Sequence, residues 1–542
     1  MGADASKPHS QRKELRSWDD LPLSESAAEH DRTHDVAAQG GVVGAMTVLS
    51  RLSGFARDVA LSHLLGAGAA ADVFFVAFRA PNFFRRLFAE GAFAQGFVPV
   101  LAEYRERGSK SALRAFVAAM GGNLATVVVA VSALGAVAAP LVVFLFAPGF
   151  AGDARFELAT DMVRITFPYL AFISLTAFAG SLLNSAQRYA VPAFTPVLLN
   201  ATLIAAALVA APAFDEPAMA LAWGVLVAGA AQFLFQLPWL KRVQLLVPPK
   251  PSWKHPGARQ VGKLLVPAAL AASAGQVNIL IGGILASMLV TGSVSWLYYA
   301  DRLMELPVGI VAVALGTVLL PNLSRLHADD NAEGFRTALD WGMRAGVLLG
   351  LPASAGLYVL ATPIVATVFL HGEMRETDAL MASAALKAFA IGLLPLVLTK
   401  IAAPGYFARQ DTATPLRYFA ASVAVNIVGS LTLIGWLGHV GIALATSLAA
   451  VVHAWLLIRG LAQRGDCRLE RRLLRVLIAS FVATALMALA LHALVADASH
   501  WLVASIWERA MQLALAVLGG GALYLVVALA LGVRAGDLKL RV

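Results

Sequence analysis

Long apolar stretches separated by short polar or Gly/Pro-containing segments fill the chain from residue 40 almost to its end. Stretches of about 18 apolar residues or more are long enough to cross a bilayer as helices. We therefore expect an all-α integral membrane protein. Dividing the pattern at its polar breaks predicts about fourteen transmembrane helices, over residues 40–64, 70–100, 114–146, 158–184, 192–212, 217–238, 262–290, 303–328, 339–366, 380–404, 414–436, 438–460, 472–496 and 510–534.

Composition excludes a water-soluble domain. Of 542 residues, 59% are hydrophobic and 14% are charged, whereas soluble domains carry roughly a quarter charged residues. The net charge of +9 comes from basic residues between the apolar stretches, where the positive-inside rule expects them, so we expect no nucleic-acid partner. The single cysteine, Cys467, excludes an intrachain disulfide and a thiolate metal cluster.

The loops predict the orientation of the chain. Residues 1–38 are polar and lack the apolar core of a signal peptide, so we expect a disordered cytoplasmic tail. Lys and Arg are concentrated in alternate loops, including those around 105–114, 241–263 and 459–475. This asymmetry predicts a multi-pass protein of the cytoplasmic (inner) membrane with both termini in the cytoplasm.

The sequence contains an internal echo. Residues 72–79, followed by Pro99, resemble residues 296–302, followed by Pro321, and residues 187–192 resemble residues 410–415. We predict two parallel six-helix repeats, an arrangement of transporters whose substrate lies between the halves, and two additional C-terminal helices whose apolar surface forms a groove for a lipid tail. The predicted segments are a tail over 1–38, a first half over 39–238, a cytoplasmic linker over 239–261, a second half over 262–460, and helices 13 and 14 with a C-terminal tail over 461–542.

Charged residues within the predicted helices are the candidates for function, because a charge in the bilayer is costly unless it faces water or a partner. In helix 1, Arg51 and Asp58 differ by about 20° around the helix axis and share a face, with Arg57 beside them. A polar stripe follows helix 2, and an acid–arginine cluster marks the predicted start of helix 8. The stripe contains Asp72, Arg79, Asn82, Arg85, Arg86 and Glu90, and the cluster contains Asp301, Arg302 and Glu305.

Arginines outnumber acids in these helices, and excess buried positive charge favours an anionic ligand. The planar guanidinium matches phosphate oxygens and stays charged, so we expect a phosphate-bearing amphiphile. For Arg79, Arg86 and Lys400 the alternative is snorkelling to the interface or pairing within one helix. The predicted cavity residues are Arg51, Arg57, Asp58, Asp72, Arg85, Arg86, Glu90 and Arg302.

No enzyme signature competes with this interpretation. The sequence has no Walker A, HExxH or GxSxG motif and no His/Cys set with metal-ligand spacing. Asp329 and Asp330 lie in a polar loop, which favours solvation over metal binding. We expect neither a catalytic site nor a metal site.

Long motifs carry a family resemblance over residues 40–530. Residues 50–58, 71–79 and 85–99 resemble the N-terminal signature of the MurJ/MviN flippases, and residues 295–307 and 403–415 are similar to the same family. The resemblance implies a fourteen-helix member of the multidrug/oligosaccharidyl-lipid/polysaccharide exporter superfamily that works by alternating access. In that family the positions of the predicted cavity residues line or border a central cavity or matter for function.

The resemblance also implies a substrate and partners. The substrate is lipid II, the undecaprenyl-pyrophosphate-linked disaccharide-pentapeptide of bacterial peptidoglycan synthesis, and we expect a monomer in contact with membrane phospholipid that associates with the cell-wall synthesis machinery. Rival interpretations are a relative that flips another undecaprenyl-linked glycan or exports drugs, a polytopic enzyme acting on polyprenyl phosphates, and a structural scaffold.

One departure from the family concerns energy coupling. Some members hold sodium partly through an acid in helix 7, where this sequence offers only Gln276 and Asn278. We therefore expect no cofactor and no sodium, and assign the driving force to the membrane potential, which supplies about 2.3 kcal/mol for each charge moved through 100 mV.

Overall fold

The computed structural model describes residues 25–88, 92–466, 471–495 and 498–534, without the side chains of some helical residues, among them 25–40, 86–88 and 266–275. Within these residues the chain is helical and has no strand, which confirms the all-α prediction. The first helix begins at Glu25, inside the segment expected to be a tail, whereas residues 1–24 lie outside the described part.

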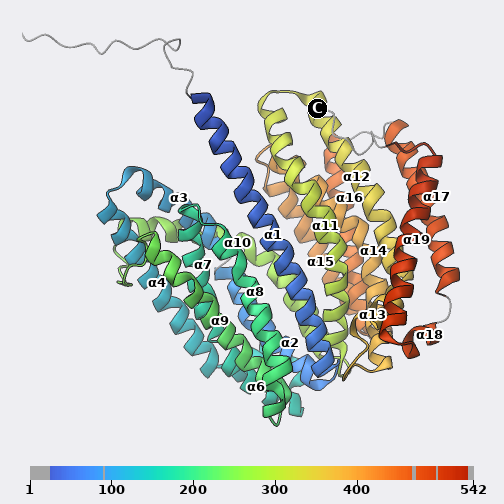
Figure 1. The fold of residues 1–542 in the computed structure, drawn as a ribbon, viewed down its shortest axis with the longest axis horizontal. Helices are drawn as coiled ribbons and strands as arrows, with labels where there is room; N and C mark the ends of the chain where they lie inside the picture. Colours follow the sequence, from blue (N-terminus) through green and yellow to red (C-terminus); the bar gives the residue numbers. More distant parts are fainter. Residues whose placement is uncertain (1–24, 89–91, 467–470, 496–497, 535–542) are drawn as a thin grey trace, which may run out of the picture.

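The helices fall into two halves and a C-terminal addition (Figure 1). The first half contains α1 (Glu25–Leu65), α2 (Ala69–Phe88), α3 (Ala92–Arg107), α4 (Lys110–Val137), α5 (Ala139–Phe146), α6 (Ala154–Thr166), α7 (Tyr169–Ser185), α8 (Ala190–Ala205) and α9 (Pro217–Arg242). The second contains α10 (Pro256–Ser287), α11 (Ser293–Ala328), α12 (Ala332–Val359), α13 (Ala361–Phe369), α14 (Glu376–Phe407), α15 (Ala413–Leu437) and α16 (His439–Gln463). The addition contains α17 (Arg471–Leu494), α18 (Ala498–Val503) and α19 (Ile506–Ala530).

The described residues include 9 helices long and apolar enough to span a membrane, or up to 11 if each bent pair is one span. Helices α1, α2 with α3, and α10 are the remaining members of the predicted order, and α1 and α2 carry the charges that interrupt apolar windows. This order is consistent with the expected arrangement of about fourteen spans.

The two halves repeat the same local breaks. Helix α4 passes into α5 at Ala138, whose N–H bonds to Leu134 O, and α12 passes into α13 at Leu360, whose N–H bonds to Gly356 O. Gln187 between α7 and α8 and Gln410 between α14 and α15 both adopt left-handed backbone angles, with φ of 59° and 60°. The structure thus repeats the turn that the sequence echo at these positions indicates.

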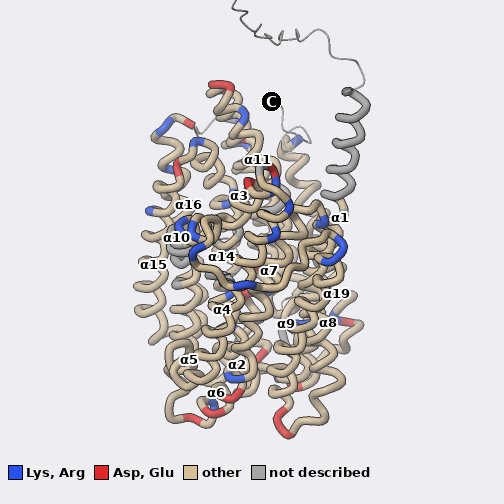
Figure 2. Tube along the Cα trace, turned by 90° about the vertical axis from the view of Figure 1, so that its left-hand side faces the viewer, with Lys and Arg blue, Asp and Glu red and all other residues tan. Residues whose placement is uncertain are grey.

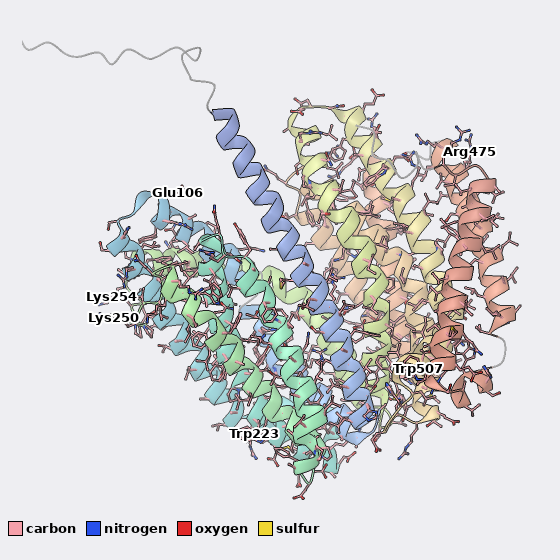
Figure 3. The ribbon with its side chains drawn as sticks, in the orientation of Figure 1. Glu106, Trp223, Lys250, Lys254, Arg475 and Trp507 are labelled. Atoms are coloured by element: carbon pink, nitrogen blue, oxygen red, sulfur yellow. The ribbon has the colours of Figure 1, made fainter. Side chains whose placement is uncertain are left out.

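The two halves stand side by side, meet at the lower end in Figure 1 and diverge toward the upper end. Helix α1 lies between them, and α17 and α19 flank the outer edge of the second half. Figure 2 shows mainly acidic residues at the lower end, basic residues at mid-height, and residues of both charges at the upper end. In Figure 3, Trp223 and Trp507 lie toward the lower end, as aromatic anchors at a membrane interface do, and Arg475 lies at the upper end.

Small residues bring helices of the second half close together. Gly342, Gly346 and Gly350 recur at every fourth position of α12. A Cβ added at these positions would lie 2.8 Å from Leu319, 2.3 Å from Ile401 and 3.0 Å from Leu394, respectively. In lipid, helices associate through close packing of small residues and not through a hydrophobic driving force. The close packing of α12 on its neighbours supports α11, which carries the charged residues.

Candidate functional site

Two adjoining cavities of about 500 and 290 Å³ lie between the halves, lined by residues of α1, α2, α5, α8, α10, α11 and α14. Their ionisable lining is predominantly cationic. The cations are Arg51, Arg57, Arg79, Arg85, Arg302 and Lys400, and the acids are Asp58, Asp301 and Glu305. The described lining therefore carries three more positive than negative side chains.

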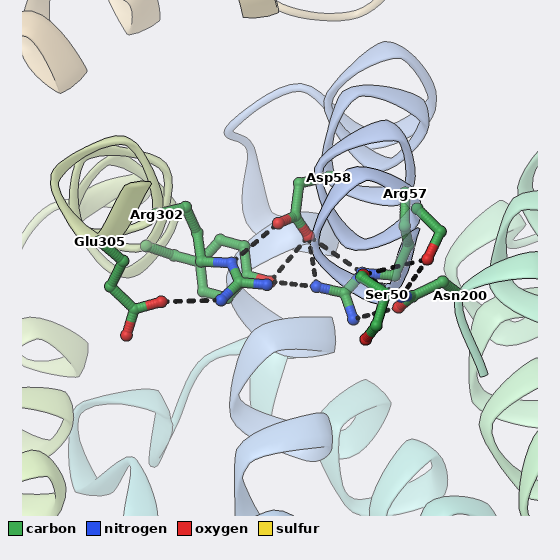
Figure 4. A network of polar contacts seen from close by, with 8 residues as sticks. Ser50, Arg57, Asp58, Asn200, Arg302 and Glu305 are labelled. Carbon is green, nitrogen blue, oxygen red and sulfur yellow. Dashed lines mark hydrogen bonds and ion pairs between the residues drawn. The ribbon is translucent and has the colours of Figure 1, made fainter. Parts of the chain in front are cut away.

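Asp58 is the centre of the polar network (Figure 4). Its Oδ1 accepts hydrogen bonds from Arg57 Nη2 at 2.6 Å and from the Tyr298 hydroxyl at 3.0 Å, and its Oδ2 accepts one from Arg302 Nε at 2.8 Å. Arg57 and Asp58 belong to α1, whereas Arg302 belongs to α11, so one carboxylate joins the two halves. Arg57 and Asp58 are 5% and 1% exposed, and breaking such a buried pair costs about 3–5 kcal/mol.

Neutral side chains fix the direction of the Arg57 guanidinium. Its Nη1 donates to Asn200 Oδ1 at 3.1 Å, and Asn200 Nδ2 in turn donates to Ser53 Oγ at 2.9 Å. The Tyr298 ring stacks on Phe75 with centroids 3.9 Å apart. Asn200 and Tyr298 were not among the predicted residues, although an asparagine within the apolar run of α8 was a usable signal.

Arg302 has a second anionic contact, which leaves part of it open to the cavity. Its Nη1 donates to Glu305 Oε2 at 2.9 Å, and 32% of the Arg302 side chain and 55% of the Glu305 side chain are exposed. Solvent screens this second pair, so it contributes about 0–1 kcal/mol. A ligand anion can therefore replace Glu305 at small cost.

Four other cations, Arg51, Arg79, Arg85 and Lys400, line the two cavities around this centre. Arg51 is exposed on the cavity wall and reaches α11, where a Cβ on Gly309 would lie 2.2 Å from its Nη1. Arg85 lines the second cavity and donates to Asn82 Oδ1 at 3.0 Å. Arg79 packs on α10, where Gly283 provides the space for its guanidinium. Lys400 enters the first cavity from α14.

Asp72 lies away from the described lining of these cavities. Its carboxylate accepts hydrogen bonds from Gly292 N at 2.7 Å and from Ser295 N and Oγ at 2.9 and 2.6 Å. It therefore caps the N-terminus of α11 from the other half of the molecule, where a helix dipole favours negative charge. Arg155 lies 3.8 Å from it.

This cap explains a wrong helix boundary. We expected a helix start at residue 303, with Asp301, Arg302 and Glu305 at the start, but α11 begins at Ser293. The left-handed Gly292, with φ of 99°, ends the preceding turn, and the Asp72 carboxylate satisfies the first free N–H groups. The charged cluster consequently lies more than two turns inside the helix, at the level of the cavity.

Two predicted residues cannot be placed. Glu90 and the side chain of Arg86 lie outside the described residues. The predicted helix 70–100 appears as α2 and α3 on either side of residues 89–91, which are also outside this part.

A smaller cavity of about 160 Å³ adjoins the second one. Its polar lining consists of Arg79, Asn278, Tyr298, Asp301, Asn426 and Thr446, and Asn426 Nδ2 donates to Asn278 Oδ1 at 2.7 Å. Gln276 lines the neighbouring cavity. Within the described residues, no cluster of three or more His, Cys, Asp or Glu side chains has a metal-binding arrangement.

An apolar groove of about 410 Å³ lies between the second half and the C-terminal helices. Residues of α11, α12, α17 and α19 line it, including Pro307, Leu349, Met487, Gly520 and Gly521. Tyr524 secures its wall, since the hydroxyl donates to Leu348 O at 2.9 Å and bonds to Ser480 Oγ at 2.9 Å. Pro307 lies two residues beyond Glu305, so the groove begins close to the charged cavity.

Comparisons with known proteins agree with one another. A family model described as "Lipid II flippase MurJ" matches residues 61–512. A "Probable lipid II flippase MurJ" of Vibrio cholerae is 44% identical over 508 residues, which cover 92% of this chain and 97% of the relative. A "Lipid II flippase MurJ" of Burkholderia cenocepacia is 42% identical over 428 residues, covering 78% and 83%.

Solved structures show the same likeness. A structure of "Lipid II flippase MurJ, inward closed conformation" superimposes with a TM-score of 0.75 at 25% identity, covering 90% of this chain and 97% of that chain. An inward-facing multidrug transporter of the MATE family reaches a TM-score of 0.64 at 15% identity, covering 78% and 97%. The second likeness concerns the fold alone.

Proposed function

The chain belongs to the MurJ family of lipid II flippases, and from this premise we propose that it moves lipid II from the inner to the outer leaflet of the bacterial cytoplasmic membrane by alternating access. The observation that carries the proposal is the cationic cavity between the halves, where Arg57 and Arg302 approach one carboxylate from opposite sides. A pyrophosphate presents the paired oxygens that two guanidinium groups bind well.

Substrate loading starts from the arrangement in Figure 1. We assign the end at which the halves diverge to the cytoplasm, because the positive-inside rule places basic loops such as the one with Lys250 and Lys254 on that side. Both termini are then cytoplasmic. In this orientation the pyrophosphate enters from the inner leaflet, and Arg302 exchanges Glu305 for phosphate oxygens.

The groove beside Pro307 suits the polyprenyl tail. Its lining is mainly apolar and includes residues of α17 and α19. One end of the groove lies near the cavity that receives the headgroup. Moving hydrocarbon from the lipid tails into this groove has little hydrophobic cost or gain, because both surroundings are apolar. The tail therefore stays in an apolar environment while the polar headgroup crosses between the halves.

Transport follows from rocking one half against the other. The halves retain their internal packing, whereas contacts between them, such as Asp58 with Arg302, have to separate and re-form. A ligand shifts this equilibrium only by binding one arrangement more tightly. Pyrophosphate fulfils this requirement because it draws together arginines that repel one another in the empty cavity.

The membrane potential is our proposed driving force, acting without a cofactor. This proposal is supported by the predicted helix 7, which offers Gln276 and Asn278 where some family members hold sodium partly through an acid. We further propose a monomer in contact with phospholipid and with the cell-wall synthesis machinery, without nucleic-acid binding and without covalent catalysis.

Depletion of the protein in its host tests the function directly. We expect lipid II to accumulate in the inner leaflet, where an externally added lipid II-cleaving enzyme cannot reach it. Accumulation in the outer leaflet would refute the proposed direction of transport. As sole copy, a variant with Arg57, Arg85 and Arg302 replaced by alanine should insert normally and fail to support growth, and normal growth would exclude this binding site.

A further inference from the structure

The lower end of the molecule contains a backbone contact between the halves. The end of α1 lies on the loop after α13, where Glu373 N donates to His63 O at 3.0 Å. Two glycines with positive φ permit this approach: a Cβ on Gly66 would lie 2.4 Å from Glu373 O, and one on Gly372 would lie 2.2 Å from His63 O. A side chain at either position would overlap the facing backbone, so this close contact between the halves requires both glycines.

Two histidines from opposite halves meet within this contact. The rings of His63 and His371 are 5.7 Å apart between centroids and nearly perpendicular, at 83°. His63 is exposed and His371 is half-buried, so protons from the surrounding solution reach both. His371 Nδ1 lies 2.9 Å from Phe369 O, and because that carbonyl can only accept, the ring donates from Nδ1.

We propose that His63 and His371 form a proton-sensitive contact that weakens closure of this end of the molecule when the solution around it is acidified. Two neutral imidazoles pack edge to face, whereas two imidazolium ions at this separation repel each other. Histidine is the side chain whose ordinary pKa places this change between about pH 5 and 8.

Neighbouring groups favour the same direction. Burial lowers the pKa of His371, and the charges of His63 and Arg509 lower it further, against the hydrogen bond to Phe369 O. Arg509 is fixed on α19 by its bonds to Ala366 O and Leu370 O. The remaining ionisable groups on the surrounding elements are Glu373 and Arg375 in the loop, Glu376 and Asp378 in the first turn of α14, His500 on α18 and Glu508 on α19.

Contact with the other half brings the charge of His63 close to His371, which lowers the pKa of His371. The separated arrangement therefore binds more protons, and closure weakens as pH falls. For two unit charges at 5.7 Å, Coulomb repulsion at the dielectric constant of water gives a factor of about three in the closure equilibrium.

Under the proposed function this end faces the periplasm, so external acidity would promote the outward-open arrangement. The consequence rests on the proposed function, but the contact is measurable without lipid II. We would attach spin labels to cysteines at Asp215 and Leu437, at the lower ends of the two halves, in a Cys467→Ala background. Electron–electron distance distributions would then be recorded in lipid nanodiscs at pH 8.0 and 5.5.

The parent protein should shift its closed-to-open ratio at least about threefold toward open on acidification. The double variant His63→Gln and His371→Gln should remain closed at both pH values. His500→Gln is the matched control, a partly exposed histidine of the same end, and should respond like the parent. The proposal is overturned if the parent does not respond, if the double variant responds equally, or if His500→Gln abolishes the response. No substrate is present, so these outcomes are independent of whether the chain transports lipid II.

Discussion

Replacing Asp72 by asparagine removes the charge that caps α11 across the two halves. The carboxylate accepts three hydrogen bonds, from Gly292 N, Ser295 N and Ser295 Oγ, at 2.6 to 2.9 Å. The amide has nearly the same shape but keeps only one acceptor atom and directs an NH₂ group at backbone donors. The change therefore acts on charge and hydrogen bonding while preserving volume.

The magnitude follows from these contacts. Each hydrogen bond to a charged group contributes about 1.5–3 kcal/mol, and the helix terminus favours a carboxylate by up to ~2 kcal/mol. Since the amide retains part of the network, we expect closure to lose about 3 kcal/mol, or roughly 150-fold in equilibrium constant. A 99:1 preference for closure would fall to near parity.

Crosslinking across this closure measures the effect. Cysteines at Gly68 and Thr291, close to the cap on each half, would be joined by a short bifunctional maleimide in a Cys467→Ala background. Asp72→Asn should reduce the crosslinked fraction strongly at unchanged expression. Asp153→Asn is the matched control, because Asp153 also pairs with Arg155, at 2.7 Å, but is not among the α11 contacts. Equal crosslinking in both variants and the parent would show that the Asp72 cap does not hold the two halves together.

Four further predictions concern other parts of the molecule. Tyr298→Phe removes the hydroxyl that donates to Asp58 and keeps the ring stacked on Phe75. The lost hydrogen bond is worth about 1 kcal/mol, so transport should fall several-fold without loss of folded protein. Unchanged transport would contradict a positioning role for Tyr298. Gly521 is among the residues that line the apolar groove, whereas Gly519 is not, and a Cβ added at either position would meet no atom within 4 Å. Gly521→Trp should therefore block flipping in vesicles, and Gly519→Trp should leave it unchanged. Bonds from Arg464 lower the pKa of Asp411 to about 2, so this ion pair stabilises the fold above about pH 4 and is lost as pH falls through about 2. The difference in Tm between the parent and Asp411→Asn should therefore stay constant between about pH 5 and 8. A change in that difference across this range would contradict the lowered pKa of Asp411. A reducible crosslink joining the halves at the lower end should stop lipid II transport until it is reduced, whereas transport at the uncrosslinked rate would exclude rocking.

The sequence predicted the features that depend on local composition. Apolar length predicted the helices, and arginine excess in helices 1, 2 and 8 indicated Arg57, Asp58 and Arg302, which the structure brings together. The echo at Gln187 and Gln410 indicated a repeated turn, since both residues adopt the same rare backbone conformation.

Features that arise from contacts between distant segments were not predictable. The start of α11 was misplaced because its cap, Asp72, lies 220 positions earlier in the chain. An asparagine in the apolar run of α8 marks Asn200 as unusual, but the sequence around Asn200 and Tyr298 does not show that their partners are Arg57 and Asp58. Asp72 itself was predicted to be functional for its charge, but its place at a helix terminus depends on tertiary packing.

The carboxylate of Asp58 sets a threshold for what the cavity accepts. It already supplies one negative charge to Arg57 and Arg302, and as part of the same chain it competes at a high effective concentration. A bulk phospholipid brings a single phosphate charge, so it can take the place of the exposed Glu305 at Arg302 but gains little by displacing Asp58, since one monoanion then replaces another. A pyrophosphate diester brings two charges and can engage both guanidinium groups at once. An internal competitor of matched valence thus allows a rare lipid to be selected from a membrane full of monophosphate headgroups.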